Sequence, residues 1–349
     1  MDSRDPGGTG SPVPAGPLIV SAAAPNDPLP GALPPRVLIL TGPTGSGKSA
    51  WAMRLAAEVP IEIISVDSAQ VYRGLDIGTA KPSAAEQQRV AHHLLDLRDP
   101  AERYSAGEFV ADASVKLREI HARGRLPVLV GGTLLYLRAL LRGMARMPAA
   151  SPGLRAIIDA EARAQGWPAM HAQLRLVDER AAARIHPNDP QRIQRALEVY
   201  RLTGRSISEW QADTHAPIAG VEWLRFALIP GDRAVQTQRL GQRFEAMLAA
   251  GLVEEVRALY QRGDLHAELP AIRAVGYRQL WEFCAGSCDL ARATQLAVTA
   301  TAQLAKRQLT WLRSEPGFQG LDPAIDSGFA TLLAAVRAGA GVAATDSRC

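Results

Sequence analysis

Short apolar runs alternate with helical patterns in the first part of the chain. The runs Arg36–Leu40, Ile61–Val66 and Leu126–Val130 predict strands, because each is short and is followed within two residues by glycine or aspartate. Helical periodicity follows over Ala50–Ala57 and again from Thr133. Apolar strands that alternate with helices predict an α/β fold with a parallel sheet covered on both faces.

The middle of the chain has a different pattern. Residues 151–214 are rich in alanine and arginine and show helical periodicity without a convincing strand, which predicts an inserted all-helical module. A strand is predicted again at Trp223–Ile229. Helices are then expected over Leu240–Arg262, Tyr277–Phe283 and Leu290–Leu312.

These patterns predict five segments. Residues 1–34 hold eight prolines and five glycines without a periodic apolar face, so we expect a disordered tail. The α/β core is expected over residues 35–147 and 220–335, interrupted by the helical module at 148–219. Residues 336–349 are expected to form a flexible tail, because the end of the chain is small and polar.

Composition narrows the class of protein. The 349 residues are 47% hydrophobic and 21% charged with a net charge of +4, which excludes simple disorder and permits an anionic partner. Three cysteines are too few for a disulfide framework, and the longest early apolar stretch, Leu18–Val20, is too short for a secretory signal. We therefore expect a cytoplasmic, monomeric protein without a membrane partner.

A glycine-rich segment between the first predicted strand and helix fits the phosphate-loop pattern G-x-x-x-x-G-K-[ST]. Its residues are Gly42, Pro43, Thr44, Gly45, Ser46, Gly47, Lys48 and Ser49. The glycines let backbone N–H groups converge on phosphate oxygens, Lys48 neutralises charge, and the Ser49 hydroxyl is a candidate Mg²⁺ ligand. The pattern leaves open whether a nucleoside triphosphate or the diphosphate of another substrate binds here.

An aspartate at a strand end is the main candidate for chemistry. Asp67 follows the second predicted strand, and in open α/β sheets this end faces the ligand crevice. The alternative is a helix cap or a solvated turn residue. The polar segment Asp67–Pro82 contains two glycines and is expected to form a loop over the crevice.

The order of motifs along the chain resembles the bacterial tRNA dimethylallyltransferases, also called tRNA isopentenyltransferases. The resemblance spans Arg36–Arg313. The matching segments are the phosphate loop, Ile64–Ser68, Asp76–Pro82, Leu129–Thr133, Ala183–Asp189, Gln191–Arg192, Arg195–Glu198, Val275–Gln279, Ala305–Gln308 and Thr310–Arg313. No departure falls at a position that should carry chemistry.

This resemblance implies a P-loop NTPase-like core with an inserted all-helical tRNA-binding module. The implied reaction transfers a dimethylallyl group from dimethylallyl diphosphate to N6 of adenosine 37, 3′ of the anticodon, in tRNAs that read codons beginning with U. Diphosphate is released. An adenine amine is a poor nucleophile, so a carboxylate that accepts its proton assists attack, and Asp67 suits that role. Lys48, Ser49 and Mg²⁺ would stabilise the leaving diphosphate.

Two further residues are implied by the family pattern. Thr133 is expected near the reacting centre and in contact with tRNA, although a threonine that only caps the following helix is the alternative. Arg233 resembles a family arginine near the diphosphate, and an ordinary surface ion pair is about as well supported.

The resemblance also implies a tRNA-binding set. Arg192 and Arg195 lie three residues apart on one predicted helix face, although a solvated face is the alternative, and Trp311 is as compatible with core as with base stacking. The set comprises Asp67, Ser68, Ala69, Gln70, Thr133, Arg155, Gln191, Arg192, Ile193, Gln194, Arg195, Arg273, Ala274, Val275, Gly276, Tyr277, Arg278, Lys306, Arg307, Gln308, Leu309, Thr310, Trp311, Leu312 and Arg313.

Three other functions fit parts of the sequence. A P-loop small-molecule kinase would use the same loop, Mg²⁺ and aspartate, but would not need the arginine-bearing insertion. An isoprenoid chain-elongating synthase would need aspartate-rich clusters, and the chain has no adjacent Asp-Asp pair. A non-catalytic RNA-binding module would tolerate the loss of Asp67, whereas an enzyme would not.

Overall fold

The computed structural model describes residues 35–338 except Arg146, Thr214–Pro217 and Ala219, and it does not describe the side chain of Arg233. The expected tail at residues 1–34 and the last eleven positions, 339–349, lie outside the described residues.

Six parallel strands form one sheet in the order β3-β2-β4-β1-β5-β6. The strands are β1 (Arg36–Thr41), β2 (Ile61–Val66), β3 (His92–His93), β4 (Leu126–Gly131), β5 (Glu222–Leu228) and β6 (Gln319–Leu321). The predicted α/β fold is therefore confirmed. The two short edge strands β3 and β6 were not predicted, because two or three residues are too few to show an apolar pattern.

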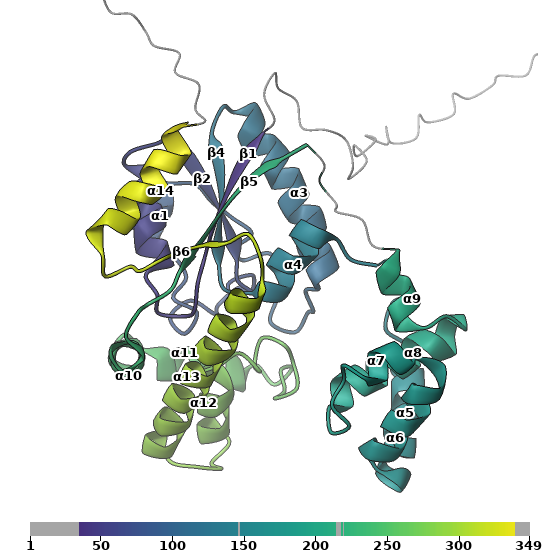
Figure 1. Ribbon diagram of the computed structural model, residues 1–349. Coiled ribbons are helices and arrows are strands. Elements are labelled where there is room, and N and C mark those ends of the chain that lie inside the picture. Colours follow the sequence, from purple (N-terminus) through teal and green to yellow (C-terminus); the bar gives the residue numbers. More distant parts are fainter. Residues whose placement is uncertain (1–34, 146, 214–217, 219, 339–349) are drawn as a thin grey trace, which may run out of the picture.

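Helices cover both faces of the sheet, with α1 (Lys48–Ala56) and α14 (Asp326–Ala338) on one face and α3 (Ala106–Ala122) and α4 (Leu134–Arg142) on the other (Figure 1). Successive β1 side chains point to opposite faces. Leu38 accordingly packs in the cluster with α1 and α14, and Ile39 packs with α3 and α4. The central strands β1, β2 and β4 are buried at nearly every position, which explains their mainly apolar sequence.

Four helices lie beyond the sheet at the end where the phosphate loop emerges (Figure 1): α10 (Arg233–Ala249), α11 (Leu252–Gln261), α12 (Tyr277–Cys284) and α13 (Leu290–Ser314). The short helix α2 (Ala84–Arg89) precedes β3. The single helix expected over Leu240–Arg262 is wrong, because Gly251 takes φ +101° and separates α10 from α11.

The expected boundary at residue 335 is also wrong. Helix α14 continues to Ala338, and Val336 is only 3% exposed. Val336 packs against the sheet, so burial extends the ordered part of the chain past the point where the composition becomes small and polar.

The inserted helices have an apolar core of their own. They are α5 (Pro152–Gln165), α6 (Trp167–Val177), α7 (Glu179–Ala182), α8 (Pro190–Thr203) and α9 (Ile207–Ala212). Ile158, Met170, Leu174, Ile193 and Leu197 meet in this core. In Figure 1 the module stands beside the sheet.

A buried carboxylate organises the module. Glu198 of α8 has no exposed surface and accepts hydrogen bonds from Ser151 N (2.8 Å), from Arg155 Nε and Nη2 (2.9 and 3.0 Å) and from Arg195 Nη1 (2.7 Å). Burial raises the pKa of Glu198, but the hydrogen bonds from the two arginines outweigh it and hold this pKa below its usual value.

We expect Glu198→Ala to lower the free energy of unfolding by about 3–5 kcal/mol, because two arginines lose a buried partner. Urea unfolding followed by circular dichroism measures the loss, and exposed Glu179→Ala on α7 is the matched control. The folded-state pKa of Glu198 is lowered, so its contribution is full above the unfolded pKa and disappears as pH falls through the folded one. Equal free energies of unfolding for Glu198→Ala and Glu179→Ala would contradict the stabilising role of the Glu198 carboxylate.

Candidate active site

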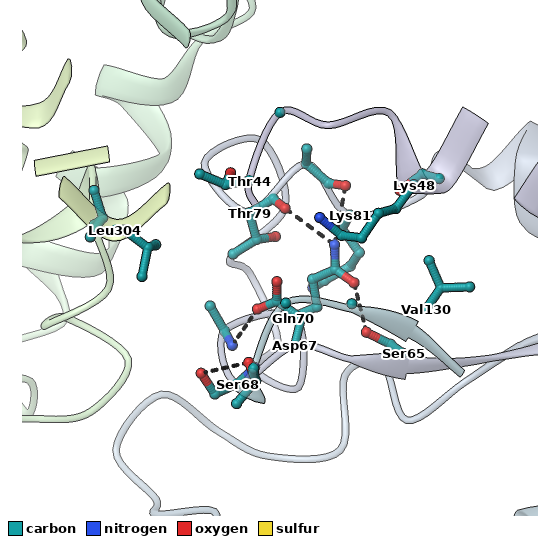
Figure 2. A pocket seen from close by; sticks show the side chains of 18 of the residues that line it. Thr44, Lys48, Ser65, Asp67, Ser68, Gln70, Thr79, Lys81, Val130 and Leu304 are labelled. Carbon is teal, nitrogen blue, oxygen red and sulfur yellow. Dashed lines mark hydrogen bonds between the residues drawn. The ribbon is translucent and has the colours of Figure 1, made fainter. Parts of the chain in front are cut away.

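A cleft of about 950 Å³ opens at the carboxyl ends of β1, β2 and β4 and is closed on its far side by residues of α10, α12 and α13. Parallel α/β sheets bind their ligands at this end of the strands. Figure 2 shows Asp67 and Lys48 on the sheet side of this cleft, with Leu304 of α13 on the opposite side.

The phosphate loop turns sharply between β1 and α1. Gly45 and Gly47 have φ +75° and +87°, a backbone conformation that favours glycine. Lys48 Nζ donates to Gly42 O (2.9 Å) and Pro43 O (2.7 Å). Burial lowers the pKa of Lys48 to about 8, against the opposing charge of Asp67. The ammonium therefore sits in the loop and titrates close to neutral pH.

The second half of this loop contains several backbone N–H donors without hydrogen-bond partners in the described part of the chain. Within the described residues, the backbone N–H groups of Gly45, Gly47, Lys48 and Ser49 have no hydrogen-bond partner. These groups surround the start of α1, where the helix dipole adds positive potential. Ser46 Oγ is buried and also lacks a partner in this part of the chain. The geometry suits an anion with several oxygens.

Asp67 follows β2 directly and lines the cleft. Its Oδ1 accepts a hydrogen bond from Ala69 N (2.8 Å), whereas Oδ2 has no partner among the residues that the structure describes. The carboxylate is thus held by one oxygen and presents the other. This arrangement suits a group that accepts a proton from a bound substrate.

Thr133 lies beside Asp67 because β2 and β4 are neighbours. Its Oγ1 accepts a hydrogen bond from Ser68 N (3.0 Å), and its own N–H donates to Val66 O (3.1 Å). Thr133 occupies the N-cap position of α4, but its side chain makes no capping hydrogen bond. A Cβ at Gly131 would lie 2.1 Å from Val66 O, so the close approach requires glycine there.

The loop after Asp67 is held from inside the cleft by Gln70. Ser65 Oγ donates to Gln70 Oε1 (2.8 Å), and Gln70 Nε2 donates to Thr79 O and Ala80 O, each at 3.2 Å (Figure 2). The amide of Gln70 is therefore already bonded to protein on both sides. It shapes the wall of the cleft next to Asp67.

Lys81 anchors the far end of the same loop. Its side chain is 4% exposed, and Nζ donates to Tyr72 O (2.9 Å) and to the carboxylates of Asp76 and Asp96. A buried lysine needs such partners to remain charged. The match of Asp76–Pro82 to the family pattern thus includes an internal cation that orders the loop.

Glu255 of α11 anchors the middle of the loop. Its carboxylate accepts hydrogen bonds from three successive N–H groups, Asp76 (3.0 Å), Ile77 (2.8 Å) and Gly78 (3.3 Å), and from Tyr277 Oη. Burial and the charge of Glu255 raise the pKa of Tyr277, so this hydroxyl stays protonated and donates. Tyr277, a member of the expected tRNA-binding set, thus donates to Glu255 and supports the loop.

Removal of this carboxylate has a predictable cost. We expect Glu255→Ala to lower the free energy of unfolding by about 2–4 kcal/mol, because several donors lose their acceptor. Hydrogen exchange at Asp76, Ile77 and Gly78 should accelerate in parallel. The adjacent Glu254→Ala, whose side chain is 69% exposed, is the control and should change neither quantity. Unchanged exchange in Glu255→Ala would rule out the anchoring role.

Arg243 of α10 lines the cleft but was not predicted from the sequence. It is half-buried; burial lowers its pKa, and the charge of Asp67 opposes this effect. With 39 basic residues in the chain, an arginine on a long helix carries no local signal. The packing of α10 against the phosphate loop brings Arg243 into the cleft that Asp67 lines.

The structure brings about half of the expected RNA-binding residues together at the cleft. Those that line it are Asp67, Ser68, Ala69, Gln70, Thr133, Arg273, Ala274, Val275, Tyr277, Arg307, Gln308 and Trp311. Lys306, Thr310, Arg278 and Arg313 are exposed outside the cleft, while Leu309 is half-buried. Leu312 is 4% exposed, and Gly276 is buried with its N–H bonded to Gln279, so neither presents a side chain to RNA.

Within the helical module, three residues expected to contact RNA are engaged by the protein itself. Ile193 is fully buried in the module core, and the guanidinium groups of Arg155 and Arg195 are bonded to Glu198. Arg192, in contrast, is 73% exposed. The shared face expected for Arg192 and Arg195 is therefore divided between solvent and a buried carboxylate.

Three other expected residues have mixed outcomes. Gln191 is exposed, whereas Gln194 donates to Asp159 (2.6 Å). Trp311 is half-buried, with its ring 6.5 Å from that of Phe318, and it lines the cleft rather than the core. Arg233 begins α10, but its side chain lies outside the described residues.

Fold and site together define a parallel α/β protein with a loop of the phosphate-loop sequence pattern, a carboxylate in the same cleft and an inserted helical module. Residues 70–315, more than half of the chain, match the sequence model of the family described as IPP transferase. The chain belongs to this family, as the motifs predicted.

Known relatives agree with this assignment. A tRNA dimethylallyltransferase of Thioalkalivibrio sulfidiphilus is 53% identical over 90% of this chain and all of its own length, and one of Methylibium petroleiphilum is 58% identical over 80% and 86%. Among solved structures, a tRNA isopentenylpyrophosphate transferase of Bacillus halodurans is 35% identical with a TM-score of 0.64, covering 87% of this chain and 96% of that one. A eukaryotic dimethylallyltransferase acting on tRNA is 27% identical with a TM-score of 0.68, covering 87% and 77%.

Two other features are not found among the described residues. None of their helices combines the length and apolar character needed to cross a membrane. They also contain no group of three or more His, Cys, Asp or Glu side chains placed to hold a metal.

Proposed function

We propose that this protein transfers the dimethylallyl group of dimethylallyl diphosphate to N6 of the adenosine 3′ of the anticodon in tRNA. The observation that carries the proposal is the placement of the Asp67 carboxylate in one cleft with a loop of unpaired N–H donors. A dimethylallyl diphosphate bound at the loop and an adenine amine beside Asp67 would then lie next to each other in the cleft.

The reaction forms a bond between N6 and the allylic C1, while the bond from C1 to the diphosphate oxygen breaks with its electron pair. The amine lone pair is delocalised into the adenine ring, so attack depends on removal of the N6 proton. Asp67 Oδ2 accepts this proton, and Oδ1 stays bonded to Ala69 N.

The leaving diphosphate would be bound by the N–H groups of Gly45, Gly47, Lys48 and Ser49 together with the Lys48 ammonium. The site also offers a ligand for Mg²⁺: Ser49 lies in the first turn of α1 with an exposed side chain that lines the cleft. When bound, Mg²⁺ would neutralise charge on the diphosphate oxygens.

The target adenine must leave the stacked anticodon loop to enter this cleft. An adenine stacked in the anticodon loop cannot reach Asp67, so the base is turned out and the surrounding loop is held by cations and stacking. Arg273, Arg307 and Trp311 line the mouth opposite the sheet and suit this role, and Arg192 offers an exposed cation on the helical module. Monomeric, cytoplasmic action stays a prediction.

The test incubates the protein with Mg²⁺, labelled dimethylallyl diphosphate and an anticodon stem-loop RNA that has adenosine 3′ of the anticodon. Label in the RNA is expected, and the same RNA with guanosine at that position is the control. Absence of transfer, together with consumption of ATP in the presence of a small alcohol, would favour the kinase alternative.

A further inference from the structure

One residue of the phosphate loop, Thr44, is held through its backbone by two buried glutamines. Gln308 of α13 is 7% exposed, and its Oε1 accepts a hydrogen bond from Thr44 N (2.8 Å). Gln236 of α10 is 5% exposed, and its Nε2 donates to Thr44 O (3.4 Å). The backbone N–H and C=O of Thr44 are thus both bonded to side chains from helices that are distant in the sequence.

Gln308 also bonds the neighbouring strand end. Its Nε2 donates to Gly132 O (2.8 Å), in the turn between β4 and Thr133. A Cβ at Gly132 would lie 2.5 Å from this nitrogen, and one at Gly45 would lie 2.7 Å from Leu240 Cδ2 of α10. The loop and the turn are therefore shaped to accept these helices closely.

The first and second halves of the phosphate loop consequently differ. Gly42 O and Pro43 O accept hydrogen bonds from Lys48, and Thr44 N donates to Gln308. The backbone groups of the first half are therefore already bonded to other groups of the protein. The donors without partners begin at Gly45. The side chains that fix the first half thereby determine where the free donors of the second half point.

We propose that Gln308 and Gln236 are positioning residues that fix the phosphate loop to α13 and α10, and that diphosphate affinity depends on them. The inference rests on the proposed function, because it takes the loop as the diphosphate site. It also revises the expectation that Gln308 binds tRNA. Arg307 and Trp311 line the cleft from the same helix, so α13 supports the diphosphate site and the RNA-facing wall together.

The test replaces Gln308 by leucine, which is similar in size but leaves Thr44 N and Gly132 O unpaired. Calorimetry with inorganic diphosphate and Mg²⁺ should give a dissociation constant about tenfold higher than in wild type. Affinity for the anticodon stem-loop should stay within about twofold. Gln303→Leu, an exposed position on α13, is the control and should leave both affinities unchanged.

Two further measurements keep the test decisive if Gln308→Leu folds poorly. Gln308→Glu retains an acceptor for Thr44 N but loses the donor to Gly132 O, so diphosphate binding between that of wild type and Gln308→Leu is expected. Gln236→Leu should also weaken diphosphate binding. In Gln308→Leu and Gln236→Leu, amide hydrogen exchange in the phosphate loop should accelerate. In Gln308→Leu, exchange of the Thr44 amide itself should accelerate as well.

Weakened RNA binding with unchanged diphosphate binding would overturn the inference and return Gln308 to the RNA surface. Unchanged binding of both ligands in all three variants would also overturn it. If wild type itself fails to bind diphosphate, the loop's role in the proposed function fails first, which separates the two conclusions.

Discussion

Asp67→Asn is expected to lower kcat for dimethylallyl transfer by about 10²- to 10⁴-fold. Asparagine keeps an Oδ1 that accepts from Ala69 N, so the local backbone is retained. What disappears is the carboxylate that accepts the N6 proton. Single-turnover assays with labelled dimethylallyl diphosphate measure the step directly, and binding of the anticodon stem-loop should change little.

The charge of Asp67 also raises the pKa of Lys48, so its removal lowers that pKa further. Assays near pH 6.5 keep Lys48 charged in both proteins and isolate the proton transfer. Asp326→Asn, an exposed residue at the start of α14, is the matched control. An Asp67→Asn enzyme with kcat near that of wild type would remove Asp67 as the base.

Lys48→Met is expected to lower kcat/KM for dimethylallyl diphosphate by about 10²- to 10³-fold. Methionine is similar in length and tolerates burial, but it brings no charge to the leaving group and leaves Gly42 O and Pro43 O without their donor. Steady-state kinetics with saturating RNA measure the change. A variant that loses less than about twofold would exclude Lys48 from the diphosphate site.

The pH profile gives a second test of Lys48. Burial lowers its pKa to about 8, so the ammonium is present below that pH and is lost above it. The value of kcat/KM should therefore fall about tenfold per pH unit above pH 8. Lys48→Arg remains charged throughout and should flatten this limb. A wild-type profile that is flat to pH 9.5 would contradict the assignment.

The elements predicted best from the sequence are those with strong local signals. Strands β1, β2, β4 and β5 are mainly apolar runs, because strands covered on both faces bury most of their side chains. Helix α3 was not predicted, although a capping box marks its start: Ser105 Oγ accepts from Glu108 N. A capping box involves only two residues, so it is a weaker signal than an apolar run of five or six residues.

The sequence by itself determined the phosphate loop, the position of Asp67 at a strand end and the family, because each depends on residues close together in the chain. Tertiary structure decided how two similar arginines differ: Arg195 donates to the buried carboxylate of Glu198 and to Pro148 O, whereas Arg192 is 73% exposed and pairs with Asp189 in its own first turn. It also joined Gln308 to Thr44 across 264 positions and Glu255 to Ile77 across 178. Such partners leave no local pattern, because helix packing alone brings them together.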